Sequence, residues 1–207
     1  MKAKRKRPGK KMMLSGLLLL ATALLLSGYN IWTEWKAGVS AHHVLEQMEG
    51  MMETSRIPEA GPDPDTPDYI LNPNMELPQK NINGKNYVGI LELPSLRLTL
   101  PVLGEYSLPD MAIAPCRYAG TAYRSGFVVA GHNYRTHFGS LNRLETGDPI
   151  YFTDMNGNGF VYHVAAVQVL GADGVEEMLS EEWDLTLFTC TYSGQTRFTV
   201  RCLAEWP

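Results

Sequence analysis

Hydrophobic and polar positions divide the chain into three parts. An apolar run over residues 12–32 is followed, after residue 55, by a segment rich in proline and acidic residues. From residue 86 onward, short apolar runs are separated by turn-forming residues. About 20 consecutive apolar residues predict a helix long enough to span a bilayer, and the short runs predict strands. The pattern therefore predicts a membrane helix, a linker and a β domain.

The C-terminal part is predicted to be mostly β. One of its turns, residues 154–159, has glycines that can adopt the positive φ of a hairpin turn. Short strands at this spacing favour a small closed barrel or a sandwich. The expected strands lie near residues 87–91, 96–102, 126–130, 149–154, 159–171, 185–190 and 197–205, and short helices are expected at 41–53, 138–144 and 174–183.

The linker has the composition of a tether. Residues 56–79 include six prolines and a run of acids, and such a segment tends to be extended and semi-stiff. It is also compatible with a lid over the functional site. The expected division is a basic tail at 1–11, a membrane helix at 12–33, a juxtamembrane helix and linker at 34–80, and a catalytic domain at 81–207.

Charge is distributed unevenly along the chain. Residues 2–11 hold seven Lys or Arg and no acid, and taking these away from the net charge of −4 leaves −11 for the rest. A basic cluster before the apolar run predicts a cytoplasmic N-terminus and an extracellular remainder in a single-pass topology. The acidic remainder argues against binding to nucleic acid, which requires a basic face.

A cleaved signal peptide is the alternative interpretation of the apolar run. Val39, Ser40 and Ala41 form an acceptable cleavage site, but they lie well beyond the run. The run is also longer than the usual signal core. We therefore favour a retained anchor.

A cysteine ends one predicted strand and an arginine begins the next. Cys190 and Arg197 flank a predicted turn, so a hairpin would bring the thiol and the guanidinium side by side. The thiolate is the nucleophilic form of cysteine, and a nearby cation favours it. Cys190 is therefore the candidate nucleophile and Arg197 the candidate cation. Arg201 shares that strand face, about 13 Å further along, and is the less favoured arginine.

A histidine at the end of another apolar run supplies a candidate base. His132 follows Gly131, which permits a tight turn, and imidazole is suited to proton transfer near neutral pH. His137 lies in the polar loop that follows and is a candidate for lining a substrate groove. We expect His163 to be structural and His42 and His43 to be solvated.

The remaining cysteines do not indicate a disulfide scaffold. Their odd total of three leaves at least one thiol free. Cys202 is expected in the core, and its pairing with Cys116 stays open. A zinc site that uses Cys190 and His132 is not favoured, because no close-spaced pair of ligands is present. No calcium-loop pattern is present either, so calcium is not indicated, although a calcium requirement stays open, and no other cofactor is expected.

Around these candidate residues the chain resembles the sortases, membrane-anchored cysteine transpeptidases of Gram-positive bacteria. The matches appear in the family's order and extend over roughly residues 86–206. The motif T-L-x-T-C corresponds to residues 186–190, R-x-x-V to 197–200 and G-H to 131–132, with flanking matches at 93–94, 98–102, 118–122, 138–141 and 147–148.

The resemblance implies an eight-stranded β-barrel and a defined chemistry. Cys190 would attack an L-P-x-T-G-like sorting signal between Thr and Gly, with His132 as acid and base and Arg197 stabilising the oxyanion. The acyl group would pass to an amine of a peptidoglycan precursor or a pilin. Thr189, next to the nucleophile, is a further candidate for the oxyanion, and Asn133 for substrate contact.

Two other functional classes are compatible with parts of the pattern. A hydrolytic cysteine protease would use the same pair of residues but admit water, and a silent membrane-tethered β domain would bind surface polymers. Residues 131–133 and 138–141 look like class B sortases, but the short segment at 171–185 lacks the long helix common in that class. Asp63 and Pro64 are followed by Asp65 rather than by the aromatic residue of a pilin-sortase lid.

Overall fold

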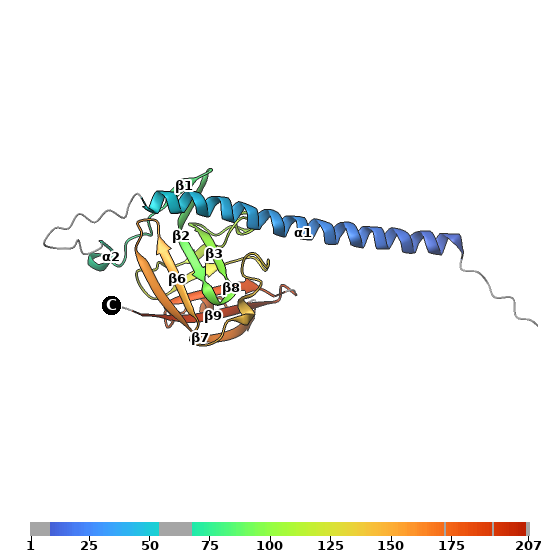
Figure 1. Ribbon diagram of the computed structural model, residues 1–207. Coiled ribbons are helices and arrows are strands. Elements are labelled where there is room, and N and C mark those ends of the chain that lie inside the picture. The colour runs from blue at the N-terminus through green and yellow to red at the C-terminus, as the bar shows by residue number, and fades with distance from the viewer. Residues whose placement is uncertain (1–8, 54–67, 172, 192, 206–207) are drawn as a thin grey trace, which may run out of the picture. The chain divides into compact units, whose positions relative to one another are not determined.

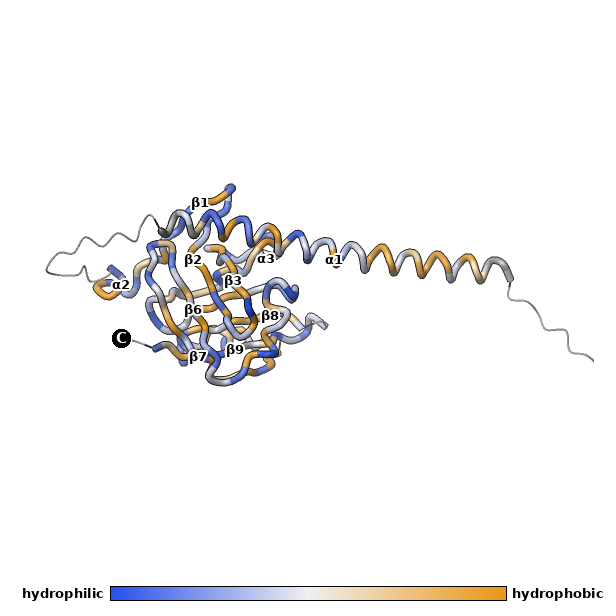
Figure 2. Tube along the Cα trace, in the orientation of Figure 1, coloured by the Kyte–Doolittle hydropathy of each residue, from blue (hydrophilic) through white to orange (hydrophobic). Residues whose placement is uncertain are grey.

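The computed structural model describes residues 9–53, 68–171, 173–191 and 193–205. Their contacts divide the chain into two compact units, Met1–Lys36 and Ala37–Pro207. Helix α1 (Lys10–Glu53) has residues in both units, and its part in the first unit carries the apolar run seen in Figure 2. Its leucines are exposed, as Leu18 at 68% and Leu25 at 74% illustrate. Within the described residues α1 is the one helix long and apolar enough to cross a membrane, by length and composition.

The second unit is built on a closed β-barrel (Figure 1). Among the described residues, nine strands pair in the order β1-β2-β3-β4-β5-β8-β9-β7-β6, and pairing of β2 with β6 closes an eight-stranded ring. Strand β1 is an extra edge strand on β2. The strands are β1 (Lys80–Ile82), β2 (Lys85–Leu93), β3 (Leu98–Leu103), β4 (Cys116–Ala119), β5 (Phe127–Ala130), β6 (Pro149–Asp154), β7 (Gly159–Gly171), β8 (Leu185–Cys190) and β9 (Thr196–Ala204).

The barrel confirms the expected fold, with differences in the short elements. Strands β1 and β4 were not expected, because neither carries a long apolar or alternating run. The helices expected at 138–144 and 174–183 are single turns. The short helices are α2 (Asp68–Leu71), η1 (Pro94–Leu96), α3 (Leu108–Met111), η2 (Leu141–Arg143) and α4 (Val175–Met178).

Strand alternation creates two apolar clusters on opposite sides of the barrel wall. Phe127 and Val129 of β5 belong to the cluster inside the barrel, whereas Val128 and Ala130 belong to a cluster outside it. Strand β5 is therefore buried on both faces, which explains its uninterrupted apolar sequence.

Helix α1 covers the outer cluster. Ala37, Ala41, Val44 and Met48 are spaced by three or four residues, so they form one stripe of the helix, and all four are buried. Val44, Leu45 and Met48 share their cluster with residues of β1 and β2, beside which α1 lies in Figure 1. The catalytic domain, expected to start at residue 81, therefore belongs to a compact unit that starts at Ala37. The helix expected at 41–53 is present as part of α1, but its packing on the barrel was not predicted.

The stripe makes the helix a structural part of the domain. Removing residues 37–80 would take away Val44, Leu45 and Met48 and would expose to water the residues of β1 and β2 that they cover. At about 1.5–3 kcal/mol for each buried side chain, we expect a loss of about 5 kcal/mol in the free energy of unfolding. Urea unfolding of the 37–207 and 81–207 fragments measures this difference, and Met48→Ala in the longer fragment should reproduce part of it. Equal free energies of unfolding for the two fragments would contradict this packing.

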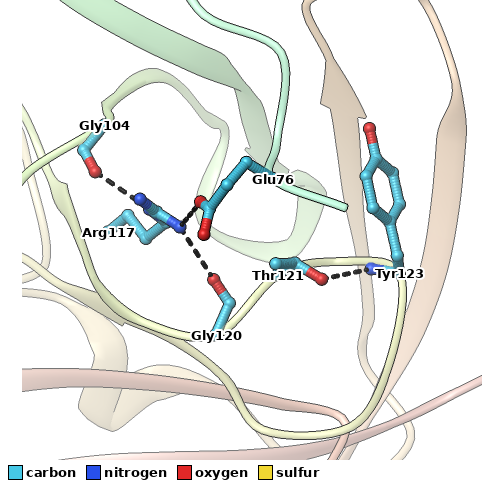
Figure 3. A network of polar contacts seen from close by, with 6 residues as sticks. All are labelled: Glu76, Gly104, Arg117, Gly120, Thr121 and Tyr123. Carbon is cyan, nitrogen blue, oxygen red and sulfur yellow. Dashed lines mark hydrogen bonds and ion pairs between the residues drawn. The ribbon is translucent and has the colours of Figure 1, made fainter. Parts of the chain in front are cut away.

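The described end of the linker is attached to the barrel (Figure 3). The Arg117 guanidinium donates to a Glu76 carboxylate oxygen at 2.8 Å and to the carbonyl oxygens of Gly104 and Gly120. The ring of Tyr69 stacks on that of Tyr123 at 4.8 Å. The part of the lid hypothesis that concerns residues 54–67 lies outside the described residues.

Candidate active site

The β8–β9 hairpin brings the candidate nucleophile and cation together. Cys190 and Arg197 are directly opposite partners in the antiparallel register, at the end where the turn joins the two strands. Directly opposite residues have Cβ atoms about 5 Å apart on the same face of the sheet. The hairpin predicted from the sequence is therefore confirmed.

His132 lies at the same end of the barrel, after β5, the strand that pairs with β8. Strand β5 runs parallel to β8 with Ala130 opposite Phe188, and the Gly131 N–H donates to the Phe188 carbonyl at 3.0 Å. His132 follows Ala130 by two residues, as Cys190 follows Phe188. His132 therefore lies just beyond the paired part of β5, at the end of the barrel where Cys190 ends β8. The three residues thus lie at one end of the barrel, Cys190 in β8, Arg197 in β9 and His132 in the loop that follows β5.

A compact loop fixes the backbone around His132. The Phe138 N–H donates to the His132 carbonyl at 3.1 Å, which folds the loop back on itself. A Cβ atom on Gly131 would lie 2.4 Å from the Phe138 ring, so only glycine fits before the histidine. The loop also rests on α1, since a Cβ on Gly38 would lie 2.9 Å from the Thr136 Cγ2 atom.

The His132 ring has a defined environment. Its Nδ1 accepts a hydrogen bond from the Asn133 N–H at 3.1 Å, which places the proton of the neutral ring on Nε2. Burial lowers the pKa of His132 below its ordinary value, because a charged imidazolium loses hydration there. The ring is therefore set up to exchange its proton through Nε2.

Cys190 and Arg197 remain accessible at the barrel end. Both are partly exposed, in contrast to the rest of β8. Arg197 Nη1 donates to the carbonyl oxygens of Gly194 and Thr196 at 3.0 and 3.2 Å, which anchors the guanidinium on the turn. Within the described ranges, no carboxylate forms an ion pair with Arg197. Its positive charge thus remains at the site.

Three aromatic side chains, Tyr106, Tyr118 and Phe188, line a cavity together with Arg197, and we call them the aromatic wall. Tyr106 contacts Tyr118 edge-on at 5.1 Å, and Tyr118 contacts Phe188 in the same way at 5.3 Å. Burial raises the pKa of Tyr106, and a negative charge on Cys190 adds to this effect, which places Tyr106 near the thiol. With Arg197 and Met178, these rings line a cavity of about 90 Å³. The sequence analysis missed this wall, because the loop holding Tyr106 approaches Cys190 only through the fold.

Two expected substrate residues lie elsewhere. Thr189 is buried and alternates with Cys190 along β8, so its hydroxyl points to the opposite side of the strand from the thiol. His137 is fully buried at 0% exposure, so it does not line an open groove. Asn133 is partly exposed and contributes its main-chain N–H to His132.

The alternative arginine has a structural environment. Arg201 is buried and donates hydrogen bonds to the Thr186 hydroxyl and to the carbonyl oxygens of Met178 and Glu177. Its register partner is Thr186, four positions from Cys190 along β8. Arg201 therefore ties α4 to the barrel wall.

The two other cysteines are buried free thiols. Burial raises the pKa of Cys116 to about 12 and raises that of Cys202 strongly. They belong to clusters on opposite sides of the barrel wall and form no disulfide, and Cys202 is in the core as expected. Of the three cysteines, all in the described part of the chain, Cys190 is the accessible one.

The other histidines do not contribute to a metal site in the described part of the chain. His42 and His43 are exposed on α1 near Glu46, and His163 bonds Glu205 on the barrel surface. Over the residues that the structure describes, no group of three or more His, Cys, Asp or Glu side chains is placed to hold a metal ion.

His137 should make the domain sensitive to acid. Burial, with a smaller contribution from His132, lowers its pKa from 6.5 to about 4. Between these two values the unfolded chain binds a proton that the folded chain does not, so stability falls as the pH falls. The loss approaches about 3 kcal/mol at pH 4. Urea unfolding at pH 7 and pH 4.5 should show a smaller pH difference for His137→Leu, whereas His163→Gln should behave as the parent does. An unchanged pH difference in His137→Leu would contradict this.

Comparisons with known proteins point to one family. A sequence profile of the family described as the Sortase domain matches residues 91–205, more than half of the chain. Sortase A of Bacillus anthracis is 29% identical over 121 residues, which cover 56% of this chain and 57% of that relative's length. The match therefore spans a little over half of that curated relative.

Solved structures share the fold. Sortase D5 transpeptidase of Clostridium perfringens has a TM-score of 0.57 at 16% identity, over 78% of this chain and 98% of that one. Sortase A of Corynebacterium diphtheriae has a TM-score of 0.53 at 19% identity, over 90% and 96% of the two chains. At these identities the likeness establishes the architecture of the barrel.

Proposed function

Since this chain belongs to the sortase family, we propose that it is a membrane-anchored cysteine transpeptidase that acts through Cys190, His132 and Arg197. The observation that carries this proposal is the pairing of Cys190 with Arg197 at the barrel end that His132 also reaches. A nucleophile, an acid and base, and a cation are the groups that acyl transfer through a thioester requires.

The first half of the reaction forms a thioester. The Cys190 thiolate attacks the carbonyl carbon of the threonine in an L-P-x-T-G-like sorting signal. The oxyanion collapses, the C–N bond to glycine breaks, and the His132 imidazolium gives its proton to the departing amine. The products are an acyl-enzyme and a peptide with a free N-terminal glycine.

Arg197 stabilises the charge that develops in this step. Its guanidinium is held on the turn by two carbonyl groups, so little reorganisation is needed when the oxyanion forms. The same charge favours the thiolate form of Cys190 before the attack. The aromatic wall of Tyr106, Tyr118 and Phe188 would cover the apolar part of the signal.

The second half returns the enzyme to its starting state. An amine of a peptidoglycan precursor or of a pilin attacks the thioester carbonyl, and His132 accepts the proton of that amine. A new amide bond forms and the Cys190 thiolate leaves. We place the N-terminus in the cytoplasm and the barrel outside the cell, where surface proteins bearing sorting signals would meet it.

The test separates transfer from hydrolysis. The full chain in detergent is incubated with LPxTG-like and NPxT-like peptides, with and without triglycine, and the products are identified by mass spectrometry. The proposal expects a product joined to triglycine that is missing with Cys190→Ala. Hydrolysed product alone, at any amine concentration, would favour the cysteine protease, and no product with any peptide would favour a binding domain.

A further inference from the structure

The catalytic histidine carries an aromatic neighbour whose geometry is well defined. The rings of His132 and Tyr134 are nearly parallel, with an angle of 4° between their planes and 4.1 Å between their centroids. Tyr134 also contacts the buried His137 ring, with 5.6 Å between the ring centroids and an angle of 50° between the planes. Tyr134 therefore contacts both the catalytic histidine and a second, buried histidine.

The loop backbone holds Tyr134 in this place. Its carbonyl accepts hydrogen bonds from the N–H groups of His137 at 3.0 Å and of Gly139 at 2.8 Å. A Cβ atom on Gly139 would lie 2.7 Å from that carbonyl oxygen, so the close approach requires glycine. Because two N–H groups fix the residue that bears the ring, the stack is built into the loop.

The buried ring behind Tyr134 supports the arrangement without adding charge. His137 is fully buried, and among the described residues neither of its nitrogens makes a hydrogen bond of ordinary geometry, although the backbone of Ile113 lies near the ring. The backbone of Ile113 favours the protonated form, but burial outweighs it and lowers the pKa of His137 to about 4, so the ring is neutral at physiological pH. A neutral ring packs against Tyr134 without opposing a positive charge on His132.

The proton transfer proposed for His132 indicates what the stacked Tyr134 ring can do. The ring must be an imidazolium when the glycine amine leaves, but its partly buried position disfavours that charge. The face of an aromatic ring carries partial negative charge and attracts a cation close to it. We propose that Tyr134 is a positioning residue that holds the His132 ring in its catalytic orientation and stabilises the imidazolium form through its aromatic face.

This inference rests on the proposed function, because the activity measured in its test is the proposed transpeptidation. The groups that the structure places at His132 are Tyr134, which stacks on it, and His137, whose pKa it lowers. Cys190 of β8 and Arg197 of β9 lie at the same end of the barrel. When substrate binding brings them close, a thiolate on Cys190 would favour the imidazolium and the Arg197 guanidinium would oppose it. A substitution at Tyr134 leaves both of these charges in place.

The test compares two substitutions in the full chain. Tyr134→Phe keeps the aromatic face, and Tyr134→Leu fills the space without it. We expect Phe to retain kcat/KM within about twofold, and Leu to lose about tenfold, mostly in kcat. The alkaline limb of the pH profile should move to lower pH in Leu, because His132 would lose its proton earlier. Tyr151→Leu, at an exposed position on β6, is the matched control and should change neither quantity.

A second readout does not depend on turnover. In chain with ¹⁵N-labelled histidine, the His132 ring should titrate at lower pH in Tyr134→Leu than in Tyr134→Phe or the parent. If the parent shows no transpeptidation while this shift is seen, the proposed function fails and the stack stands. An unchanged titration in Leu, or a loss in Phe as large as that in Leu, overturns the role of the aromatic face.

Discussion

Replacement of Cys190 by alanine is expected to reduce transpeptidation at least about 10⁴-fold, with the fold intact. The thiol forms the covalent bond to the substrate, and no other group at this end of the described barrel can replace it. Alanine removes one sulfur atom from a partly exposed strand end, so the cost in stability should be small. Initial rates of product formation and the midpoint of thermal unfolding measure the two effects separately.

The buried cysteines provide the matched controls. Cys116→Ala and Cys202→Ala should each retain most of the activity and lose about 1 kcal/mol of stability, because each removes a sulfur atom from a packed cluster. Retained activity in Cys190→Ala, or its loss in a stably folded Cys116→Ala, would contradict the assignment of the nucleophile.

Replacement of Arg197 by glutamine is expected to lower kcat/KM about 10²- to 10³-fold. The substitution removes the charge that faces the thiolate and the oxyanion but keeps a side chain of similar length. Arg197 lies at the open end of the hairpin, where its hydrogen bonds stay within the turn, so thermal unfolding should change little. Arg197→Lys should recover part of the rate, since it restores the charge without the planar fork.

Arg201 gives the opposite pattern. Its guanidinium is buried and bonded to three oxygen atoms, two of them at the end of α4. Arg201→Gln would leave these acceptors without their donor and should lower stability by about 2 kcal/mol or more. At a temperature where this variant is folded, its kcat/KM should stay within about tenfold of the parent. A larger loss of rate in Arg201→Gln than in Arg197→Gln would show that the oxyanion role belongs to Arg201 and not to Arg197.

The hairpin and its two functional residues could be predicted because the required signals are local. An apolar strand, a five-residue turn and a second apolar strand determine that Cys190 and Arg197 face each other. Strand alternation is equally local, and applying it to Thr189 would have predicted that its hydroxyl points away from the thiol.

Other features depend on contacts between distant segments. The polar loop after His132 indicated an open groove, but His137 is buried because the Phe138 N–H folds that loop back on His132. Tyr106 approaches Cys190 from a loop more than 80 residues away in the sequence. The stripe at Ala37 and Met48 was visible as a helical pattern, but its partners on β1 and β2 were not.

The most direct test of the central claim is to locate the acyl group on the enzyme. The full chain is mixed with a reactive LPxTG-like peptide without an amine acceptor, quenched in acid, digested and mapped by mass spectrometry. The account predicts a thioester on the peptide that contains Cys190, none on those that contain Cys116 or Cys202, and its disappearance when triglycine is added. Turnover without any thioester, or a thioester on another cysteine, would contradict the account.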